Sequence, residues 1–367
     1  MPVICKVVKG GAALNKIAVI GAGGTGYTVA AELAFRGYET WLCDIFAAGE
    51  PIVVQQSKEI NITGSVVETA VIHRITNNVK AVLENTQLVI CCTISNRDEE
   101  VARTIAPHLM SGSKVLISAG NLGSLIYYRV FQELGIHDVI VGETCGNLFS
   151  CRRLDENTVL IGNPDPYKPR KAAAFPAKNT QILVDAFAGV YPLVSSVSIL
   201  ETALNGPNVL SHISLTVINA GAIENAEEPY YIFKQGICRS TLNLADALWA
   251  EKKQVMDALG FSCAPSPSNS HRKYADRSLK QFDHFRNLAG PDSMTSRYIS
   301  EDIPILGCFF LSVAKAVGVE TPVYSAMVRV TEAINQTPYY AQGRTLQNLG
   351  LAHLHGNQVP EYFRTAE

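Results

Sequence analysis

The hexapeptide GAGGTG, which begins at Gly21, constrains the fold more than any other segment of the chain. It follows the apolar run KIAVI and precedes a helical pattern, so we expect it to form a turn between a strand and a helix. In such a turn Gly21 allows the tight bend, Gly23 lets the backbone approach a pyrophosphate, and Gly26 lets helix and strand pack closely. Gly24 and Thr25 begin the helix, where free N–H groups and the positive end of the helix dipole bind phosphate. The segment therefore predicts a dinucleotide-binding βαβ unit.

An acidic residue at the end of the second predicted strand indicates which dinucleotide is bound. Asp44 closes the run ETWLC, and an acid at this place accepts hydrogen bonds from the adenosine ribose hydroxyls and repels a 2′-phosphate. The next residues, Ile45 and Phe46, supply no arginine for that phosphate. We therefore expect NAD as the cofactor and favour it over NADP.

The N-terminal half alternates short apolar runs with helical stretches. Runs without polar alternation fit parallel strands that are buried on both faces, so the predicted fold is α/β with a doubly wound, Rossmann-type parallel sheet. Thr93 and Asn121 follow two of these runs, and ligands of such sheets bind at the carboxyl ends of the strands. Both are candidate cofactor-binding residues, although Asn121 could equally be a simple turn residue. The predicted strands are residues 16–21, 39–44, 88–94 and 114–120.

Beyond about residue 200 the apolar runs become long and helical, so we expect an all-α C-terminal domain. The predicted boundaries are residues 15–198 for the nucleotide-binding domain and 199–360 for the helical domain. Residues 263–297 are polar and broken by prolines, and we expect irregular loops there that cover the active site. The fourteen residues that precede the first strand have no assigned role.

Composition excludes several classes of function. The formal net charge is −2 with acids and bases mixed, so neither nucleic acid nor an anionic membrane is an expected partner. No apolar run reaches the roughly 18 residues that a membrane span needs. The nine cysteines show no CxxC spacing, so we expect no metal site and interpret them as buried thiols of the reducing cytoplasm.

Four sequence blocks together resemble the opine dehydrogenases, the family of octopine and nopaline dehydrogenases. The blocks are GAGGTG, GETCGNLFSCRR at 142–153, LETALNGPNVLSH at 200–212 and SRYISEDIP at 296–304, and the likeness extends over nearly the whole chain. The resemblance implies a nucleotide-binding domain followed by an all-helical substrate domain. It also implies reductive condensation of the amino group of an amino acid with a 2-oxo acid such as pyruvate, through an imine. The small-molecule partners would thus be an amino acid and a 2-oxo acid, and a homodimer is left open.

The resemblance also assigns candidate catalytic residues. His212 matches the family's catalytic histidine, Asp302 its carboxylate partner, and Arg297 the basic residue of the same cluster. His212 would transfer protons, Asp302 would hold its tautomer, and Arg297 would bind a substrate carboxylate. Without the family, His212 could be a hydrogen-bonded core histidine, Asp302 could complement a helix dipole, and Arg297 could be a surface charge.

Three more residues of the second block, Glu143, Asn147 and Arg152, are predicted to line the substrate site. The alternative is a structural role at the junction between the two domains.

Two other functions fit the same two-domain plan. One is a dehydrogenase of a small hydroxy acid or a polyol phosphate, which would use a lysine of the helical domain as its acid; the available lysines are Lys234, Lys252, Lys253 and Lys315. The other is a nucleotide sensor that has lost catalysis, because fold alone does not imply function.

Overall fold

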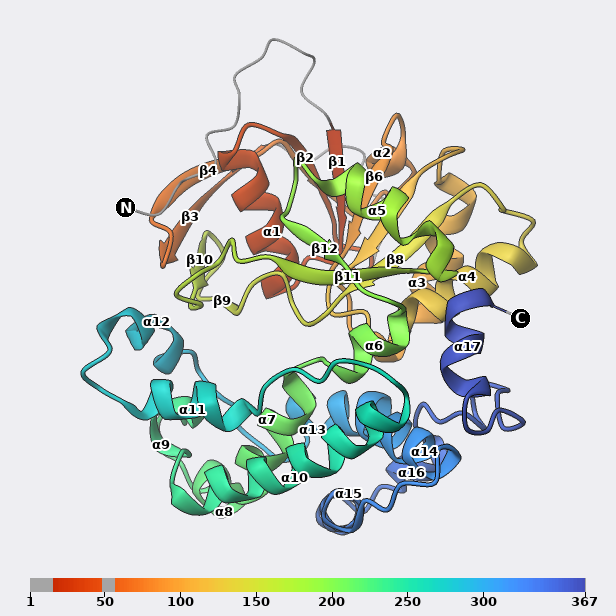
Figure 1. Cartoon of the computed structure of the whole chain (residues 1–367). Helices are drawn as coiled ribbons and strands as arrows, with labels where there is room; N and C mark the ends of the chain where they lie inside the picture. Colours follow the sequence, from red (N-terminus) through yellow and green to blue (C-terminus); the bar gives the residue numbers. More distant parts are fainter. Residues whose placement is uncertain (1–15, 48–56, 367) are drawn as a thin grey trace.

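The computed structural model describes residues 16–47 and 57–366 of the chain. The first fourteen residues, for which the sequence suggests no role, and the predicted domain start at residue 15 lie outside this part. Two sheets and their helices form one half of the molecule, and a layer of helices forms the other (Figure 1). Helix α6, Ile199–Leu204, lies between the two halves.

The larger sheet has β1 near its middle and runs in the order β12-β11-β8-β7-β6-β1-β2-β5. The six strands from β8 to β5 are mutually parallel, as predicted for a Rossmann-type sheet. Helices α1 and α5 pack on one face and α2, α3 and α4 on the other, so the doubly wound architecture is confirmed. The eight strands are β1 Lys16–Ile20, β2 Glu39–Cys43, β5 Arg74–Thr76, β6 Leu88–Cys91, β7 Lys114–Ile117, β8 Ile140–Thr144, β11 Arg170–Phe175 and β12 Leu193–Ser195. The helices of this half are α1 Gly24–Phe35, α2 Val79–Leu83, α3 Asp98–Ile105, α4 Gly123–Glu133 and α5 Thr180–Phe187.

Two features of this half differ from the prediction of a purely parallel sheet. Strand β11 pairs antiparallel with β8, and β12 follows the direction of β11. A second sheet in the order β4-β3-β10-β9 covers the outer side of α1, and its buried isoleucines share a core with that helix. Helix α1 is thus enclosed between two sheets, which holds the glycine-rich turn at its start. The strands of this sheet are β3 Lys58–Gly64, β4 Glu68–Ile72, β9 Cys151–Arg153 and β10 Thr158–Ile161.

The C-terminal half is helical, as predicted, and its core includes residues of α7, α10, α14 and α15. That core continues into the other half through Leu125 of α4 and Phe175 of β11. No helix in the described part of the chain is long and apolar enough to cross a membrane. The helices are α7 Asn208–Thr216, α8 Ala220–Glu224, α9 Ile232–Gln235, α10 Arg239–Ala258, α11 Pro267–Ala275, α12 Asp283–Arg286, α13 Arg297–Ser300, α14 Cys308–Ala316, α15 Pro322–Asn335, α16 Tyr339–Gln342 and α17 Gln358–Thr365.

The segment 263–297 is more ordered than the expected loops. It contains α11, which begins at Pro267 after the capping hydroxyl of Ser266, and the short α12. A proline in the first turn lacks only an N–H that would have no partner there, so Pro267 starts a helix rather than preventing one, while Pro265 and Pro291 lie in loops.

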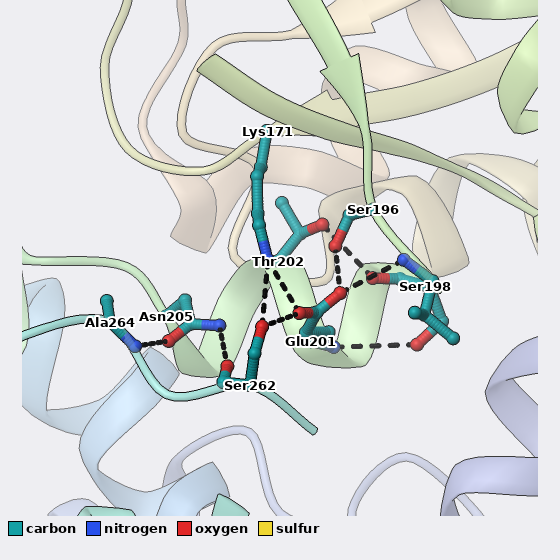
Figure 2. Close-up of polar contacts among 9 residues, drawn as sticks. Lys171, Ser196, Ser198, Glu201, Thr202, Asn205, Ser262 and Ala264 are labelled. Atoms are coloured by element: carbon teal, nitrogen blue, oxygen red, sulfur yellow. Dashed lines mark hydrogen bonds and ion pairs between the residues drawn. The ribbon is translucent and has the colours of Figure 1, made fainter. Parts of the chain in front are cut away.

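The junction between the halves is built around a buried carboxylate in the first turn of α6. Glu201 accepts hydrogen bonds from Lys171 Nζ at 2.7 Å and Ser262 Oγ at 2.8 Å on one oxygen, and from Ser196 Oγ and the Val197 amide on the other (Figure 2). Burial opposes the charged form, but these hydrogen bonds outweigh it and lower the pKa of Glu201 to about 2. The carboxylate therefore ties β11 and the loop after α10 to the start of α6. The predicted boundary after residue 198 falls just before this helix and stays a prediction.

Replacing Glu201 by Gln is expected to lower the free energy of unfolding at pH 7 by about 1–3 kcal/mol, because hydrogen bonds to a charged acceptor are lost. The folded pKa lies below the unfolded value of 4.5, so the stabilisation is complete above that value and is lost as the pH falls through about 2. The stability difference between wild type and Glu201→Gln should therefore shrink steadily from pH 5 to pH 3. Denaturant unfolding followed by circular dichroism at several pH values measures it.

The matched control is Glu59→Gln on β3, an exposed glutamate outside this network, which should leave the unfolding midpoint nearly unchanged at every pH. If the difference in free energy of unfolding between wild type and Glu201→Gln stays constant with pH, Glu201 is not a charged, hydrogen-bonded carboxylate in the folded state.

Candidate active site

A cavity of about 390 Å³ lies where the carboxyl ends of β1, β6 and β7 face helices α7 and α13. Strands β1 and β6 are neighbours from which the chain continues in opposite directions along the sheet, and ligands of doubly wound sheets bind at such a switch point. The lining combines residues of both halves: Gly23, Gly24, Thr25, Cys92, Thr93, Ile94, Ser118, Ala119, Asn121, Asn147, Cys151, Arg152, Arg153, Asn208, His212, Arg297, Tyr298, Glu301 and Asp302.

The glycine-rich turn forms one wall of this cavity. Gly23, Gly24 and Thr25 line it at the start of α1, whose first turn carries no acid that would repel a phosphate. Gly21 and Gly26 stand behind them, because a Cβ on Gly26 would lie 1.7 Å from the Gly21 carbonyl oxygen. These residues fit a bound dinucleotide: the tight turn exposes the backbone N–H groups of the helix start to the cavity.

Thr93 and Asn121 also line the cavity, as the strand-end argument predicts. Asn121 is a turn residue at the edge of the cavity, and its role in cofactor binding stays a prediction. It holds a turn with a φ of 51°, and its side chain donates a hydrogen bond to Ser95 Oγ at 3.2 Å.

Asp44 follows β2 directly and does not border this cavity. Its amide donates to the Thr76 carbonyl at 2.9 Å, which leaves the side chain at the end of the strand next to the glycine-rich turn. One cation that the sequence did not reveal lies nearby: the Arg97 guanidinium is 3.7 Å from the Phe46 ring centre. Two of its nitrogens donate to the carboxylate of Glu100, so its charge is already paired.

His212 and Asp302 meet in the cavity from two separate helical segments. His212 lies on α7, one turn after Asn208, and its Nδ1 is hydrogen-bonded to Asp302 Oδ2. The two side chains are buried, with 9% and 6% of their residues' surface exposed. The Tyr298 ring stacks on the imidazole with 3.7 Å between ring centres and 13° between ring planes. The imidazole is therefore held at one nitrogen and one face, and Nε2 is the nitrogen left for a ligand.

Arg152, from the other half of the molecule, holds Tyr298 in its stacked position on His212. It donates to the Tyr298 hydroxyl at 2.7 Å and through two nitrogens to the Ala289 carbonyl. It lines the cavity as predicted, and its contacts position Tyr298.

Arg297 begins α13 and lines the cavity with 53% of its side chain exposed. Within the described chain its ion pair is with Glu301 at 3.9 Å, while Glu301 also accepts the Ser95 amide at 2.9 Å. The guanidinium is therefore available to a carboxylate in the cavity.

Of the remaining predicted residues, Asn147 lines the cavity and Glu143 does not. Glu143 is fully buried at the end of β8, where its carboxylate accepts the Leu122 amide at 2.9 Å and the Ser124 amide at 3.1 Å. Burial raises the pKa of Glu143 and these hydrogen bonds oppose the rise. The prediction that Glu143 lines the substrate site is corrected: it supports the turn that carries Asn121.

Sequence reasoning missed Arg344, which no motif marks. It is buried and donates to the Ser95 carbonyl and to Asp98 Oδ2, both at 2.9 Å, and to the Asn121 carbonyl. Tyr298 and Glu301 were also missed, although both lie inside the SRYISEDIP block. Their roles become visible only in the structure, where Tyr298 stacks on His212 and Glu301 accepts the Ser95 amide.

Two cysteines, Cys92 and Cys151, line the same cavity. Burial raises the pKa of both thiols, so neither is a thiolate nucleophile at neutral pH. Among the described residues no group of three or more His, Cys, Asp or Glu is arranged to hold a metal ion.

Two family models match the chain in succession. Residues 17–144 match ketopantoate reductase PanE/ApbA, and residues 195–335 match the alpha-helical domain of NAD/NADP octopine/nopaline dehydrogenase. Among curated relatives, opine dehydrogenase of Arthrobacter sp. strain 1C is 26% identical over 92% of this chain and 95% of its own length. Vitopine synthase of Allorhizobium ampelinum is 20% identical over 92% and 96%.

Solved structures share the fold. Octopine dehydrogenase with NADH and L-arginine superimposes with a TM-score of 0.63 at 14% identity, over 96% of this chain and 98% of that one. A ketopantoate reductase from Ralstonia eutropha JMP134 gives a TM-score of 0.57 at 16% identity, over 88% and 98%. The helical-domain model spans two of the four sequence blocks, 200–212 and 296–304, and the curated relatives match over nearly the whole chain. The resemblance is therefore confirmed: the chain is an NAD(P)-dependent oxidoreductase that is similar to the opine dehydrogenases.

Proposed function

We propose that this protein condenses the amino group of an amino acid with a 2-oxo acid such as pyruvate and reduces the resulting imine with NADH. The observation that carries the proposal is that the His212–Asp302 pair borders the same cavity as the glycine-rich turn. A proton-transfer group and a dinucleotide therefore face one substrate. The reaction needs proton transfer and hydride transfer at the same substrate carbon, which first forms the imine and is then reduced.

Proton transfer is assigned to Nε2 of His212. The nitrogen takes a proton from the ammonium group of the amino acid, so that the free amine can attack the keto carbon. It returns the proton to the hydroxyl of the adduct, which leaves as water and gives the imine. The chemistry that bound NADH supplies is hydride transfer to the imine carbon, which yields a secondary amine.

Asp302 and Arg297 act beside the histidine. The Asp302 carboxylate accepts from Nδ1, which fixes the tautomer that leaves Nε2 as the acceptor and stabilises the imidazolium. Arg297 holds a carboxylate of the 2-oxo acid, because its planar fork matches two carboxylate oxygens. Tyr298 keeps the imidazole plane fixed by stacking.

The rival hydroxy-acid or polyol-phosphate dehydrogenase needs a lysine beside the nucleotide, and the cavity gives it little support. Of Lys234, Lys252, Lys253 and Lys315, none lines the cavity that holds His212. A nucleotide sensor would have no need of a buried histidine held by a carboxylate and a stacked ring.

A reducing compartment such as the cytoplasm is part of the proposal. The eight cysteines that the structure describes are all free thiols, and burial raises the pKa of seven of them: Cys43, Cys91, Cys92, Cys145, Cys151, Cys263 and Cys308. The homodimer stays a prediction.

The first test concerns the cofactor. NADH is expected to bind more tightly than NADPH, because Asp44 favours ribose hydroxyls and the charge of Arg97 is paired with Glu100. Asp44→Ala should reduce the difference in affinity between NADH and NADPH. Separate fluorescence titrations with NADH and NADPH measure it, and equal or tighter binding of NADPH to the wild type would contradict the assignment.

The second test concerns the two substrates. Pyruvate alone should oxidise NADH slowly, and the correct amino acid should accelerate it strongly because the imine accepts the hydride. NADH absorbance with a panel of amino acids, followed by mass measurement of the product, decides the matter. Fast oxidation that no amino acid changes would instead favour the hydroxy-acid rival.

The third test concerns His212 and Asp302. His212→Ala should lower turnover by at least about a hundredfold, the usual value of a placed proton-transfer group, with NADH affinity nearly unchanged. Asp302→Asn should also lower turnover, because an amide can hold the wrong tautomer and cannot stabilise the imidazolium. Steady-state kinetics and NADH titration provide both numbers.

The double variant tests whether the pair acts as one unit. Its turnover should be little lower than that of His212→Ala. Losses that multiply would show independent roles, and near-normal turnover in a folded His212→Ala protein would make the residue a core histidine.

A further inference from the structure

A second cavity, of about 430 Å³, borders the first. Asn147 and Asn208 line both, and Asn208 lies one turn before His212 on α7. A substrate whose nitrogen reaches His212 can therefore extend past Asn208 into this second space. Nothing in the mechanism above uses it.

The second cavity is lined by four cationic residues: Lys168, Arg170, Lys252 and Lys273. The acid in its lining is Asp165, which is exposed, as are Lys168 and Lys273, whereas Arg170 is half-buried and Lys252 buried. His271 also lines it, but burial and the neighbouring His212 lower the pKa of His271 to about 4, so the ring is neutral at pH 7. The cavity therefore carries an excess of positive charge.

Lys252 is the most informative of the four cations. It lies on α10 with 4% of its surface exposed, and its ammonium has no hydrogen bond or ion pair with any residue that the structure describes. Its near neighbours are the thiols of Cys145 and Cys263, and burial lowers its pKa. The Lys252 side chain lines the cavity, so the cavity is the side from which its ammonium can meet a partner, and an anionic ligand there would supply the missing counter-charge.

The wall beside Lys252 is held by side chains rather than left as a flexible loop. Asn205 donates to the Ser262 carbonyl at 2.9 Å and accepts the Ala264 amide at 2.7 Å (Figure 2). Ser211, which precedes His212, is hydrogen-bonded to His271 Nε2 at 3.2 Å. These contacts connect the cavity wall to α6 and α7 and keep its shape fixed relative to the His212–Asp302 pair.

We propose that the second cavity receives the anionic side chain of the amine substrate, so that the preferred amine is an amino acid with an acidic side chain. This inference rests on the proposed function. Arg297 in the first cavity already serves the carboxylate of the 2-oxo acid, so the anion beside Lys252 belongs to the other substrate. Even with Asp165 set against them, the four cations of the lining carry more positive charge than a single α-carboxylate needs, which points to a second anionic group.

The experiment compares acidic amino acids with their neutral amides, using pyruvate and NADH. We expect kcat/KM for glutamate or aspartate to exceed that for glutamine or asparagine at least tenfold. Lys252→Met should reduce this ratio about tenfold or more by raising the KM for the acid, while kcat with the amide changes little. A further comparison uses O-phosphoserine and serine as amine substrates. A higher kcat/KM for O-phosphoserine supports the proposal with a phosphate group as the anion.

The matched control is Lys253→Met. Lys253 on α10 is exposed and paired with Asp257 on the surface. Its replacement should therefore leave the kcat/KM ratio of acid to amide unchanged, for both glutamate over glutamine and aspartate over asparagine. Lys252→Met should also fold, because it replaces a buried, unpaired cation by an apolar side chain of similar length. Thermal unfolding checks this, and a melting temperature at or above the wild-type value is expected.

Three outcomes would overturn the proposal. The first is a higher kcat/KM for the amides or for arginine than for the acidic amino acids. The second is an equal loss of kcat/KM for all amino acids in Lys252→Met, which would mean that Lys252 binds the α-carboxylate. The third is a change in Lys252→Met that affects only the KM for pyruvate. A binding measurement separates this proposal from the proposed function: glutamate should raise the melting temperature of the NADH-loaded protein more than glutamine does. If no amine supports NADH oxidation, the proposed function fails, and this difference still decides the identity of the second cavity.

Discussion

The arrangement of the site depends on a buried ion pair between the two halves of the chain. Arg344 of the helical half pairs with Asp98 at the start of α3 and donates to the carbonyls of Ser95 and Asn121. A buried ion pair adds little net stability, because desolvation offsets most of the Coulomb attraction, but removing one partner would leave an uncompensated charge. The pair therefore selects one relative placement of the halves. Since Asn121 lines the first cavity and Ser95 is held by Glu301, that placement also sets the width of the site.

Once the halves are placed, the imidazole of His212, to which we assign proton transfer, has little freedom. Asp302 binds one edge of His212, Tyr298 covers one face, and Arg152 from β9 fixes the Tyr298 hydroxyl. A ring held in this way keeps its tautomer and orientation before a substrate binds, which is the condition for efficient proton transfer. The same contacts bring a residue of the nucleotide-binding half to the support of a residue of the helical half, so the chemistry requires both.

The sequence predicts those parts of the fold and site that local patterns encode. GAGGTG after an apolar run requires a strand, a tight turn and a helix, and the family blocks bring His212, Asp302 and Arg297 to one cavity. The second sheet was not predicted, because β3 and β4 alternate buried and exposed residues only over part of their length. Glu143 was misassigned for a different reason. A carboxylate inside a motif has the same sequence signal whether it binds a substrate or two backbone amides, and only burial distinguishes the cases.

The two adjoining cavities separate chemistry from selection. Under the proposed function, the first contains the elements that an imine reduction needs: amides for a phosphate, the His212–Asp302 pair for proton transfer and Arg297 for a carboxylate. The second contains charge that the reaction itself does not require, including a lysine buried without a partner. Such charge also selects against wrong substrates, since a neutral or cationic side chain that filled the cavity would separate the Lys252 ammonium from water without giving it a counter-charge. Because Asn208 lines both spaces on the helix that carries His212, the proposed binding of an acidic side chain in one cavity would orient the reacting nitrogen in the other.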